Sequence, residues 1–277
     1  LCNHYTNMPL LTFTSDFGSS DHLVGGVKGE ILKLNEGFQI IDITHDIIPY
    51  NFMQAAYVCR NAINNFAAGT FHLVMVNLFD EKPEHLLLAE HNGNYIACAD
   101  NGLLTMILEE VPQKVVALNL DKTKPKNTLY CIQIFAKAIT EISNGKKLEE
   151  IGDSSVSIQV KNPLRPMLGN NWIEGQIIFV DNFENVIINI NKDDFEEQRK
   201  GRSFKIVFKR DEVIDRISES YADVNEGEKL ALFNSANYLE IAINKGNAAG
   251  LLGLQGFSEK QVQSNRLFYQ TVKVFFE

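Results

Sequence analysis

The stretch that decides the fold is Leu11 to Gly29, which reads LTFTSDFGSSDHLVGGVKG. Its first four residues, Leu11 to Thr14, alternate apolar and hydroxyl side chains, which predicts a short strand. Apolar residues then recur at the spacing of one helix face, at Leu23, Val24, Val27, Ile31 and Leu34. The segment between them therefore connects a strand to a helix.

Two carboxylates lie in this connection, Asp16 and Asp21. In an open α/β sheet, ligands bind at the edge where the strands end and the helices begin. The sequence therefore places both residues on a candidate binding edge. Both also fit the ordinary roles of aspartate in turns and at helix N-caps, so the ligand-binding and the purely structural interpretations stay open here.

The chain has 277 residues, of which 45% are hydrophobic, enough for one large or two moderate domains. No segment reaches the length of a membrane span, and we expect no signal peptide. The four cysteines lack Cys-x-x-Cys spacing, which predicts reduced thiols and a cytoplasmic protein. The net charge of −9 argues against nucleic acid as a partner and is compatible with a cationic ligand.

Strand and helix patterns alternate up to about residue 160, which predicts a mostly parallel sheet with helices on both faces. The dipeptide Asn92-Gly93 separates two of the strands and is a strong hairpin signal. After the first strand and helix, the expected elements are residues 38–43, 52–62, 71–76, 86–89, 95–99, 103–109, 115–120 and 134–142.

The pattern changes at residues 162–171, where two prolines and an Asn/Gly-rich segment predict a linker. Short strand-like runs follow, separated by Gly, Asn and Asp, and they predict a small all-β domain that is a barrel or a sandwich. The fold class expected is thus α/β, with an N-terminal domain over 1–165 and a smaller, barrel-like β domain over 172–277. The expected C-terminal strands are residues 175–180, 186–190, 204–208, 229–233 and 238–243.

No motif for a metal, a dinucleotide, a nucleoside triphosphate or a serine nucleophile is present, so we expect no metal and no cofactor. What remains is a set of carboxylates and amides at the ends of predicted strands. These groups suit a neutral or cationic ligand rich in hydroxyls, because one carboxylate can accept two hydrogen bonds from a vicinal diol. They are Asp16, Asp21, Asp100, Asn101, Asp181, Asn185 and Asn234.

Short motifs run nearly from end to end of the chain: Thr14–Gly18, Asp21, Lys28–Gly29, Asp42–His45, Gly69–Thr70, Asp100–Leu104, Asp181–Asn185, Asn234–Ser235, Glu240–Ala242 and Gly246–Ala249. As an ordered series over two domains, they resemble the family of S-adenosylmethionine hydroxide adenosyltransferases, or S-adenosylmethionine hydrolases, relatives of the fluorinases and chlorinases. The resemblance implies S-adenosylmethionine as the substrate. It also implies a homotrimer with the site between the N-terminal domain of one subunit and the C-terminal domain of the next.

The resemblance implies roles for three residues of the N-terminal domain. Asp16 corresponds to the aspartate that holds the ribose hydroxyls of the adenosyl group. Asp21 corresponds to a carboxylate that faces the methionine ammonium. Tyr50 occupies the place of an aromatic residue near the ribose and the sulfonium, where a cation over a π face gains about 0.5–2 kcal/mol.

It also implies ligand-binding roles in the C-terminal domain. Asp181 corresponds to a second carboxylate that faces the ammonium. Asn185 and the backbone of Asn247 and Ala248 match the part that reads adenine, and Ser235 lies in a further matching motif among the expected ligand-binding residues. Glu184 replaces a glycine of the family's Asp-x-Phe-Gly-Asn run, which could crowd the pocket.

Catalysis in such hydrolases is a displacement at the ribose 5′ carbon by water or hydroxide that an Asp, an Arg and a His position. Here these three positions are changed. Asn77 stands at the aspartate, Glu84 at the arginine with His85 next to it, and Tyr130 at the histidine. Tyr130-Cys131 is similar to the Tyr-Ser of the halogenases, but their insertion loop is absent.

The leading hypothesis is therefore hydrolysis of S-adenosylmethionine to adenosine and methionine, with Asn77, Glu84 or His85, and Tyr130 as a substitute water site. The alternative is a binding or regulatory protein that retains S-adenosylmethionine or adenosine without turning it over. A halogenase, or an enzyme that uses another nucleophile, is the third. The sequence alone does not separate the first two, because both keep the binding residues.

Overall fold

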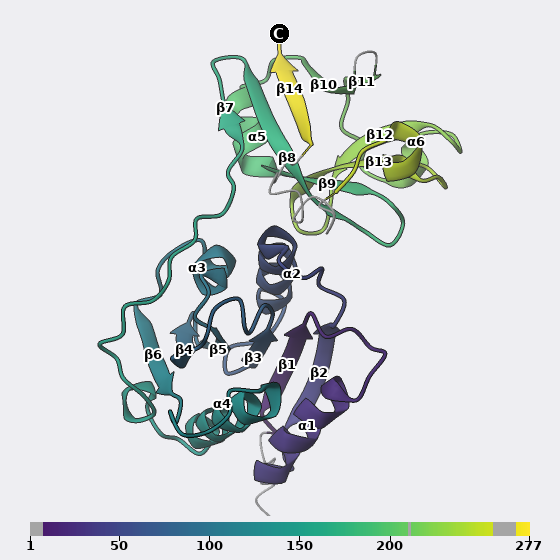
Figure 1. The fold of residues 1–277 in the computed structure, drawn as a ribbon. Helices are drawn as coiled ribbons and strands as arrows, with labels where there is room; N and C mark the ends of the chain where they lie inside the picture. Colours follow the sequence, from purple (N-terminus) through teal and green to yellow (C-terminus); the bar gives the residue numbers. More distant parts are fainter. Residues whose placement is uncertain (1–7, 210–211, 257–269) are drawn as a thin grey trace, which may run out of the picture. The chain divides into compact units, whose positions relative to one another are not determined.

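The computed structural model describes residues 8–209, 212–256 and 270–277. The chain divides into two compact units, one that ends at Pro163 and one that begins at Leu164. Each unit has its own sheet (Figure 1). Each also has its own hydrophobic core.

The first unit is built on a six-stranded sheet with the strand order β2-β1-β3-β5-β4-β6. Parallel pairs join β1 to β2, β1 to β3 and β3 to β5, whereas β4 runs antiparallel between β5 and β6. The sheet is therefore mostly parallel, as predicted. Its strands are β1 (Leu10–Ser15), β2 (Gln39–Thr44), β3 (Phe71–Met75), β4 (His85–His91), β5 (Asn94–Ala99) and β6 (Lys114–Asn119).

The strand order reverses at β1. The chain runs from β1 to β2 on one side and then returns to β3 on the other side of β1. A crevice forms at such a switch point, because the connections after the two neighbouring strands leave in opposite directions. The carboxyl ends of β1 and β3 are therefore where the topology favours a ligand site.

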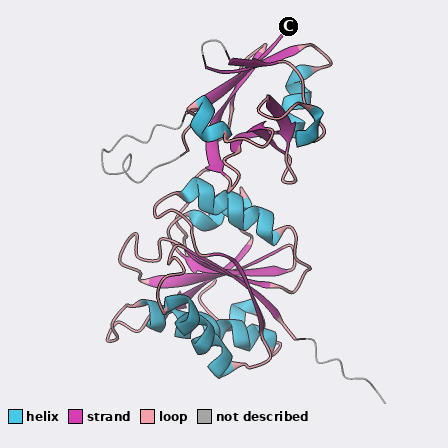
Figure 2. Ribbon diagram, turned by 90° about the vertical axis from the view of Figure 1, so that its right-hand side faces the viewer, coloured by secondary structure: helices cyan, strands magenta, loops and turns pink. Residues whose placement is uncertain are grey.

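Helices cover both faces of this sheet (Figure 2). One face carries α1 (Leu23–Leu34) and α4 (Thr128–Ser143), which pack against each other, and the opposite face carries α2 (Phe52–Ile63) and α3 (Leu103–Leu108). A short 3₁₀ turn, η1 (Leu148–Glu150), follows α4. The predicted pattern of a sheet flanked by helices on both faces is confirmed.

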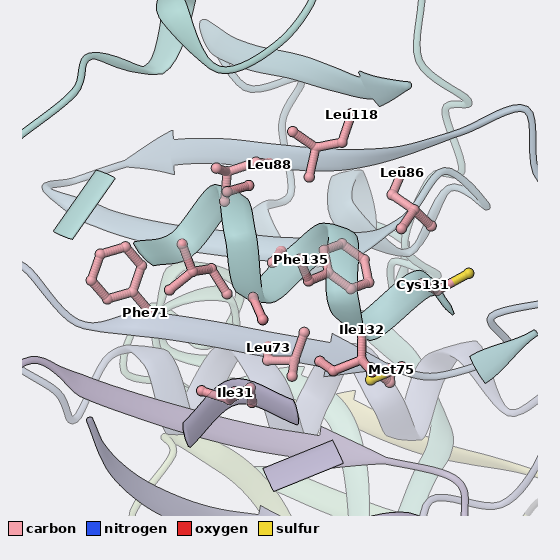
Figure 3. Packing of buried hydrophobic residues seen from close by; sticks show 14 of the residues in the cluster. Ile31, Phe71, Leu73, Met75, Leu86, Leu88, Leu118, Cys131, Ile132 and Phe135 are labelled. Carbon is pink, nitrogen blue, oxygen red and sulfur yellow. The ribbon is translucent and has the colours of Figure 1, made fainter. Parts of the chain in front are cut away.

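The main core of the first unit fills the space between the sheet and the α1–α4 pair. Alternation along the strands supplies it: Leu73 and Met75 of β3 and Leu86 and Leu88 of β4 point to the same side (Figure 3). Phe135 of α4 lies among them and is completely buried. One face of the sheet is therefore apolar and is covered by α4.

The second unit holds an eight-stranded antiparallel sheet in the order β11-β10-β14-β8-β9-β13-β12, with β7 paired to β8. An ion pair between Lys229 of β12 and Glu212 of β11 joins its two outer strands, so the sheet is nearly closed and barrel-like. Its strands are β7 (Met167–Leu168), β8 (Trp172–Val180), β9 (Val186–Asn191), β10 (Phe204–Lys209), β11 (Glu212–Ile214), β12 (Lys229–Phe233), β13 (Tyr238–Ile243) and β14 (Thr271–Phe276).

This unit also contains helices that the sequence analysis did not identify, α5 (Lys192–Arg199) and α6 (Ala248–Leu252), together with the 3₁₀ turn η2 (Tyr221–Asp223). In α5 only Phe195 is fully buried, so the helix has no apolar periodicity to read. The sequence signals that predict this helix lie instead at its N-terminus. The Asn191 side chain accepts a hydrogen bond from the Asp194 N–H, and acidic residues occupy the first turn.

Cys59, Cys98 and Cys131 are buried and free, and Cys2 lies outside the described residues. Burial raises the pKa of the Cys59 thiol to about 12 and that of Cys131 to about 11, which makes them poor nucleophiles. Within the described part of the chain, no helix is both long and apolar enough to cross a membrane.

We expect Phe135→Ala to lower the free energy of unfolding by roughly 3–5 kcal/mol, because it leaves a cavity between α4 and the sheet. Lys137→Ala, on the exposed side of the same helix, is the matched control and is expected to change it by less than about 0.5 kcal/mol. Urea unfolding followed by circular dichroism measures both. Equal effects of the two substitutions would contradict this account of the core.

Candidate functional site

Asp16 directly follows β1 at the switch point of the first sheet. The main-chain N–H of Asn77, just beyond β3, donates a 2.8 Å hydrogen bond to Asp16 Oδ2. Since β1 and β3 are parallel neighbours, this bond links the carboxyl ends of both strands. Burial raises the pKa of the Asp16 carboxyl above its ordinary value, and the bond from Asn77 opposes that rise. A half-buried carboxyl group thus occupies the predicted binding edge.

Asn77 connects this edge to two further segments. Its side-chain Oδ1 accepts a 2.8 Å hydrogen bond from the N–H of Tyr50, and its carbonyl accepts one of 3.0 Å from Asn101 Nδ2. Its Nδ2 is buried and makes no hydrogen bond. The backbone has φ +49°, in the left-handed region that asparagine tolerates better than most residues. Both polar ends of the Asn77 side chain are therefore occupied or covered.

Tyr50 and Asp21 lie in the segments that follow β2 and β1. Tyr50 stands between β2 and α2 with its side chain largely exposed, at 56% of its full accessibility, so its ring is free to cover a ligand. Asp21 Oδ1 accepts a 2.8 Å hydrogen bond from the N–H of Leu23, the first residue of α1. The carboxylate of Asp21 therefore has the helix-start role that the sequence left open, and its ligand role stays a prediction.

A chain of polar contacts, which the sequence analysis missed, supports the residue before Asp16. Ser15 Oγ lies 2.8 Å from His45 Nδ1, and His45 Nε2 lies 3.2 Å from Asp42 Oδ1. Lys28 Nζ completes the chain at 2.5 Å from Asp42 Oδ2. Burial alone would raise the pKa of Asp42, but the hydrogen bond from Lys28 and the nearby His45 ring outweigh it and leave that pKa below its ordinary value.

The contacts of Ser15, His45 and Asp42 follow the order of a serine nucleophile, its base and the residue that orients the base. The burial of Ser15 rules out a catalytic role for them. Ser15 is fully buried, so its Oγ has no access to a substrate. These polar contacts instead hold the end of β1 against the end of β2. The sequence did contain a signal for these contacts, the polar run Asp42 to His45 at the end of a predicted strand. In the sequence analysis this run served only as one of the motifs of the family resemblance.

Two of the four predicted water-site residues share a cavity of about 280 Å³ at the same edge. His85 begins β4, and its Nε2 lies 2.8 Å from Asp100 Oδ2, beyond the end of β5. Gln159 N–H donates a 2.8 Å bond to the other oxygen of Asp100. Glu84 also lines this cavity, whereas Asn77 and Tyr130 are not among its lining residues.

Tyr130 lies in the first turn of α4 and is largely buried. Its hydroxyl oxygen accepts a 2.8 Å hydrogen bond from the N–H of Asp121. Lys124 Nζ and Lys126 Nζ lie 5.7 and 5.4 Å from the centre of its ring. The Tyr130 side chain therefore fastens the segment between β6 and α4.

In the second unit, Asp181 organises the loop between β8 and β9. Its Oδ1 accepts hydrogen bonds from the N–H groups of Phe183 (2.9 Å) and Asn185 (2.8 Å), and its Oδ2 accepts one from Asn185 Nδ2 (3.0 Å). Glu184, where the family has glycine, has φ +61°. Glycine is favoured at such a position because a side chain there costs about 1–2 kcal/mol.

This loop and the β13–α6 connection line a cavity of about 610 Å³. The cavity brings together three of the predicted ligand-binding residues, Asp181, Asn185 and Asn247. Asn247 also caps α6, and Ala248 is fully buried behind it. Ser235 lies in the turn between β12 and β13 and is not among the lining residues.

Glu240 is a buried carboxyl group behind this cavity that the sequence analysis did not include among the site residues. It lies on β13, is 3% exposed and accepts a 2.6 Å hydrogen bond from the hydroxyl of Tyr221, which lines the cavity. Burial raises its pKa, the bond from Tyr221 opposes this, and the charge of Asp181 adds to the rise. A charged residue within an otherwise apolar strand was the available signal.

Among the described residues, no three His, Cys, Asp or Glu side chains gather in a way that could hold a metal ion. The chemistry that these edges offer is therefore that of carboxylates, amides and phenols.

Comparison with known proteins identifies the family. Residues 11–152 match the N-terminal domain model, and residues 175–260 the C-terminal domain model, of the SAM hydroxide adenosyltransferases. The chain belongs to this family, whose members use S-adenosylmethionine (SAM) in adenosyl transfer.

Named relatives include both hydrolases and halogenases. The (R)-S-adenosyl-L-methionine hydrolase of Methanocaldococcus jannaschii is 28% identical over 92% of this chain and 96% of its own length. A fluorinase of Actinopolyspora mzabensis is 22% identical over 87% and 92%. The crystal structure of an uncharacterized conserved protein from Thermotoga maritima matches with a TM-score of 0.80 and 27% identity, over 96% of this chain and 99% of that one.

We expect Glu240→Gln to change how stability depends on pH. Because folding raises the pKa of Glu240, the native protein binds more protons than the unfolded chain above the ordinary value of 4.5, so rising pH destabilises it. Glutamine keeps an acceptor for Tyr221 and does not titrate. The free energy of unfolding of the wild type, relative to the variant, should therefore fall as the pH rises above 4.5. Urea titrations at several pH values measure it, with the exposed Glu226→Gln as control. A constant difference would contradict the prediction.

Proposed function

We propose that this protein hydrolyses SAM to adenosine and methionine. The observation that carries the proposal is the half-buried Asp16 carboxyl group at the switch point of the sheet. A carboxylate has about four acceptor positions and the bond from Asn77 uses one, so Asp16 can still accept two hydrogen bonds from the ribose diol. The family of the chain and the hydrolases among its relatives support SAM as the substrate.

In the proposed reaction, the oxygen of a water molecule attacks the 5′ carbon of the ribose. The bond from that carbon to sulfur breaks, and the sulfur keeps the electron pair, so methionine leaves as a neutral thioether. The water gives up one proton to a base or to solvent, and adenosine results. Since the sulfonium is already activated, the protein contributes mainly alignment and the removal of solvent around the nucleophile.

The proposal includes a shared site. The residues expected at the ribose, Asp16 and Tyr50, lie in the first unit, and those expected at adenine and the ammonium, Asn185, Asn247 and Asp181, lie in the second. We propose that the protein is a homotrimer in which the first unit of one subunit and the second unit of the next complete each site.

A second candidate function is SAM binding without turnover. The observation that favours it is the state of two water-site residues. Asn77 Oδ1 is bonded to the Tyr50 N–H and its Nδ2 is buried, while the Tyr130 hydroxyl is bonded to the Asp121 N–H. The Asn77 side chain therefore presents no free polar group to a water molecule, and the Tyr130 hydroxyl keeps only its own hydrogen to donate. His85, whose Nε2 contacts Asp100, remains as a water-site residue that lines a cavity.

Turnover separates the two candidates. We expect the purified protein, incubated with SAM, to form adenosine detectable by chromatography, at a rate that halide does not change. We expect the combined Asn77→Asp, Glu84→Arg and Tyr130→His variant to be faster, and each single variant to differ little from the wild type, because groups that act as a unit are not additive. If the wild type binds SAM but forms no adenosine over hours, and the triple variant does, the binding function stands and hydrolysis is wrong.

The division of ligand contacts is tested by calorimetry with adenosine and SAM. Asp16→Ala should weaken both ligands by roughly 2–4 kcal/mol, because two charge-assisted hydrogen bonds are lost. Asp181→Asn keeps an oxygen for the loop N–H groups, removes the charge and costs only the bond from Asn185 Nδ2, so it should weaken SAM much more than adenosine. Asp181→Ala should weaken both, because the loop loses its acceptor.

The exposed Asp193→Asn on α5 is the control, since it removes the same charge away from either site. Equal losses for adenosine and SAM in Asp181→Asn would refute the assignment of the ammonium to Asp181. Lower stability of Asp16→Ala with unchanged affinity for both ligands would show that Asp16 is only a turn residue.

A further inference from the structure

A second cavity opens at the carboxyl edge of the first sheet, with a volume of about 550 Å³. Two segments form it, the one between β3 and β4 and the one between β6 and α4. Four of its seven lining residues are lysines, and one is a carboxylate. The lining residues are Phe79, Glu81, Lys82, Pro83, Lys122, Lys124 and Lys126.

The four lysine ammonium groups in this cavity lack ion-pair partners. Within the described residues, no carboxylate oxygen lies within 4.0 Å of any of them, whereas Lys28, Lys114 and Lys161 in the same unit are all ion-paired. Two carboxylates moderate the charge from further away, Glu81 in the wall and Asp121 nearby. The local excess of positive charge stands out on a chain whose net charge is −9.

The segment that carries three of these lysines is held in place. Lys126 Nζ donates hydrogen bonds to the carbonyls of Asp121 and Lys124, and the Tyr130 hydroxyl accepts from the Asp121 N–H. The side chains of Lys122 and Lys124 are exposed and make none of these hydrogen bonds; Lys124 Nζ lies over the Tyr130 ring. The fold thus gathers lysines whose mutual repulsion disfavours such a cluster, and an anionic ligand would relieve it.

The cavity also has an apolar wall. Phe79 is 45% exposed, which is unusual for a phenylalanine, and Pro83 stands beside it in the lining. An exposed aromatic ring next to ammonium groups fits a ligand that joins a flat ring to a charged group. The volume is within the range of small-molecule sites.

We propose that this cavity binds a small phosphate-bearing ligand, with Lys82, Lys122 and Lys124 on the phosphates and a planar ring against Phe79. SAM is not this ligand, because its sulfonium would be repelled here. The inference does not depend on hydrolysis. The cavity nevertheless shares Glu81, Lys82 and Pro83 with the one that holds His85 and Asp100, so an occupant would contact the wall between them.

The test is calorimetry at low ionic strength with two probes that lack adenine, inorganic triphosphate and uridine triphosphate. We expect the Lys122→Glu/Lys124→Glu variant to bind triphosphate at least about tenfold more weakly than the wild type. The control is Lys137→Glu/Lys192→Glu, which makes the same change in net charge at exposed sites elsewhere and should bind as the wild type does. Added salt should weaken binding by the wild type.

Phe79→Ala tests the apolar wall. We expect the wild type to bind uridine triphosphate more tightly than triphosphate, and Phe79→Ala to remove that difference. Equal loss of triphosphate affinity in the cavity and control variants would show a general charge effect and overturn the proposal, as would the absence of binding at millimolar probe. All readouts are binding, so a failure of hydrolysis leaves them unchanged.

Discussion

The hydrogen bond from the Asn77 N–H to Asp16 is the interaction on which the candidate site depends. It joins β1 and β3 where the strand order reverses, and it gives a half-buried carboxyl group a donor that partly offsets the cost of its burial. Asn77 reaches it with a left-handed backbone, and Asn101 and Tyr50 then attach to Asn77. Without this bond, the buried carboxyl group would lose a hydrogen-bond donor. The segments of Asp16, Tyr50 and Asn101 would no longer be joined through Asn77.

Much of the fold was readable because the relevant signals are local. The alternation in Leu11–Thr14 and the Asn92-Gly93 turn predicted β1 and the β4–β5 hairpin, and the structure contains both. Helix α5 was not predicted from the sequence, because Phe195 is its single buried side chain and the helix therefore has no apolar periodicity. Its capping residues were visible in the sequence, but caps also occur in turns. Amphipathic periodicity is therefore the stronger signal, and α5 does not have it.

The site was readable to a lesser degree. Asp16 could be placed at a strand end because strand and helix patterns flank it. Its partner Asn77 is 61 residues away, and their contact follows from the pairing of β1 with β3, which local patterns do not determine. The same holds for Ser15 and His45, joined across β1 and β2. Glu240 is a different case, since its burial depends on the packing of the whole second sheet.

The choice between hydrolysis and binding without turnover depends on the altered water-site positions. The side-chain oxygens of Asn77 and Tyr130 both accept hydrogen bonds within the protein, from the N–H groups of Tyr50 and Asp121 respectively. In this chain, therefore, these two positions stabilise loops at the edge of the sheet. A displacement with a neutral thioether as leaving group still needs only an aligned water and a proton acceptor. In the proposed hydrolysis this acceptor is His85, whose Nε2 lies 2.8 Å from Asp100 in an adjoining cavity. The proposal of hydrolysis therefore places the attacking water on the His85 side, whereas the alternative proposal, binding without turnover, has the bound ligand close that side.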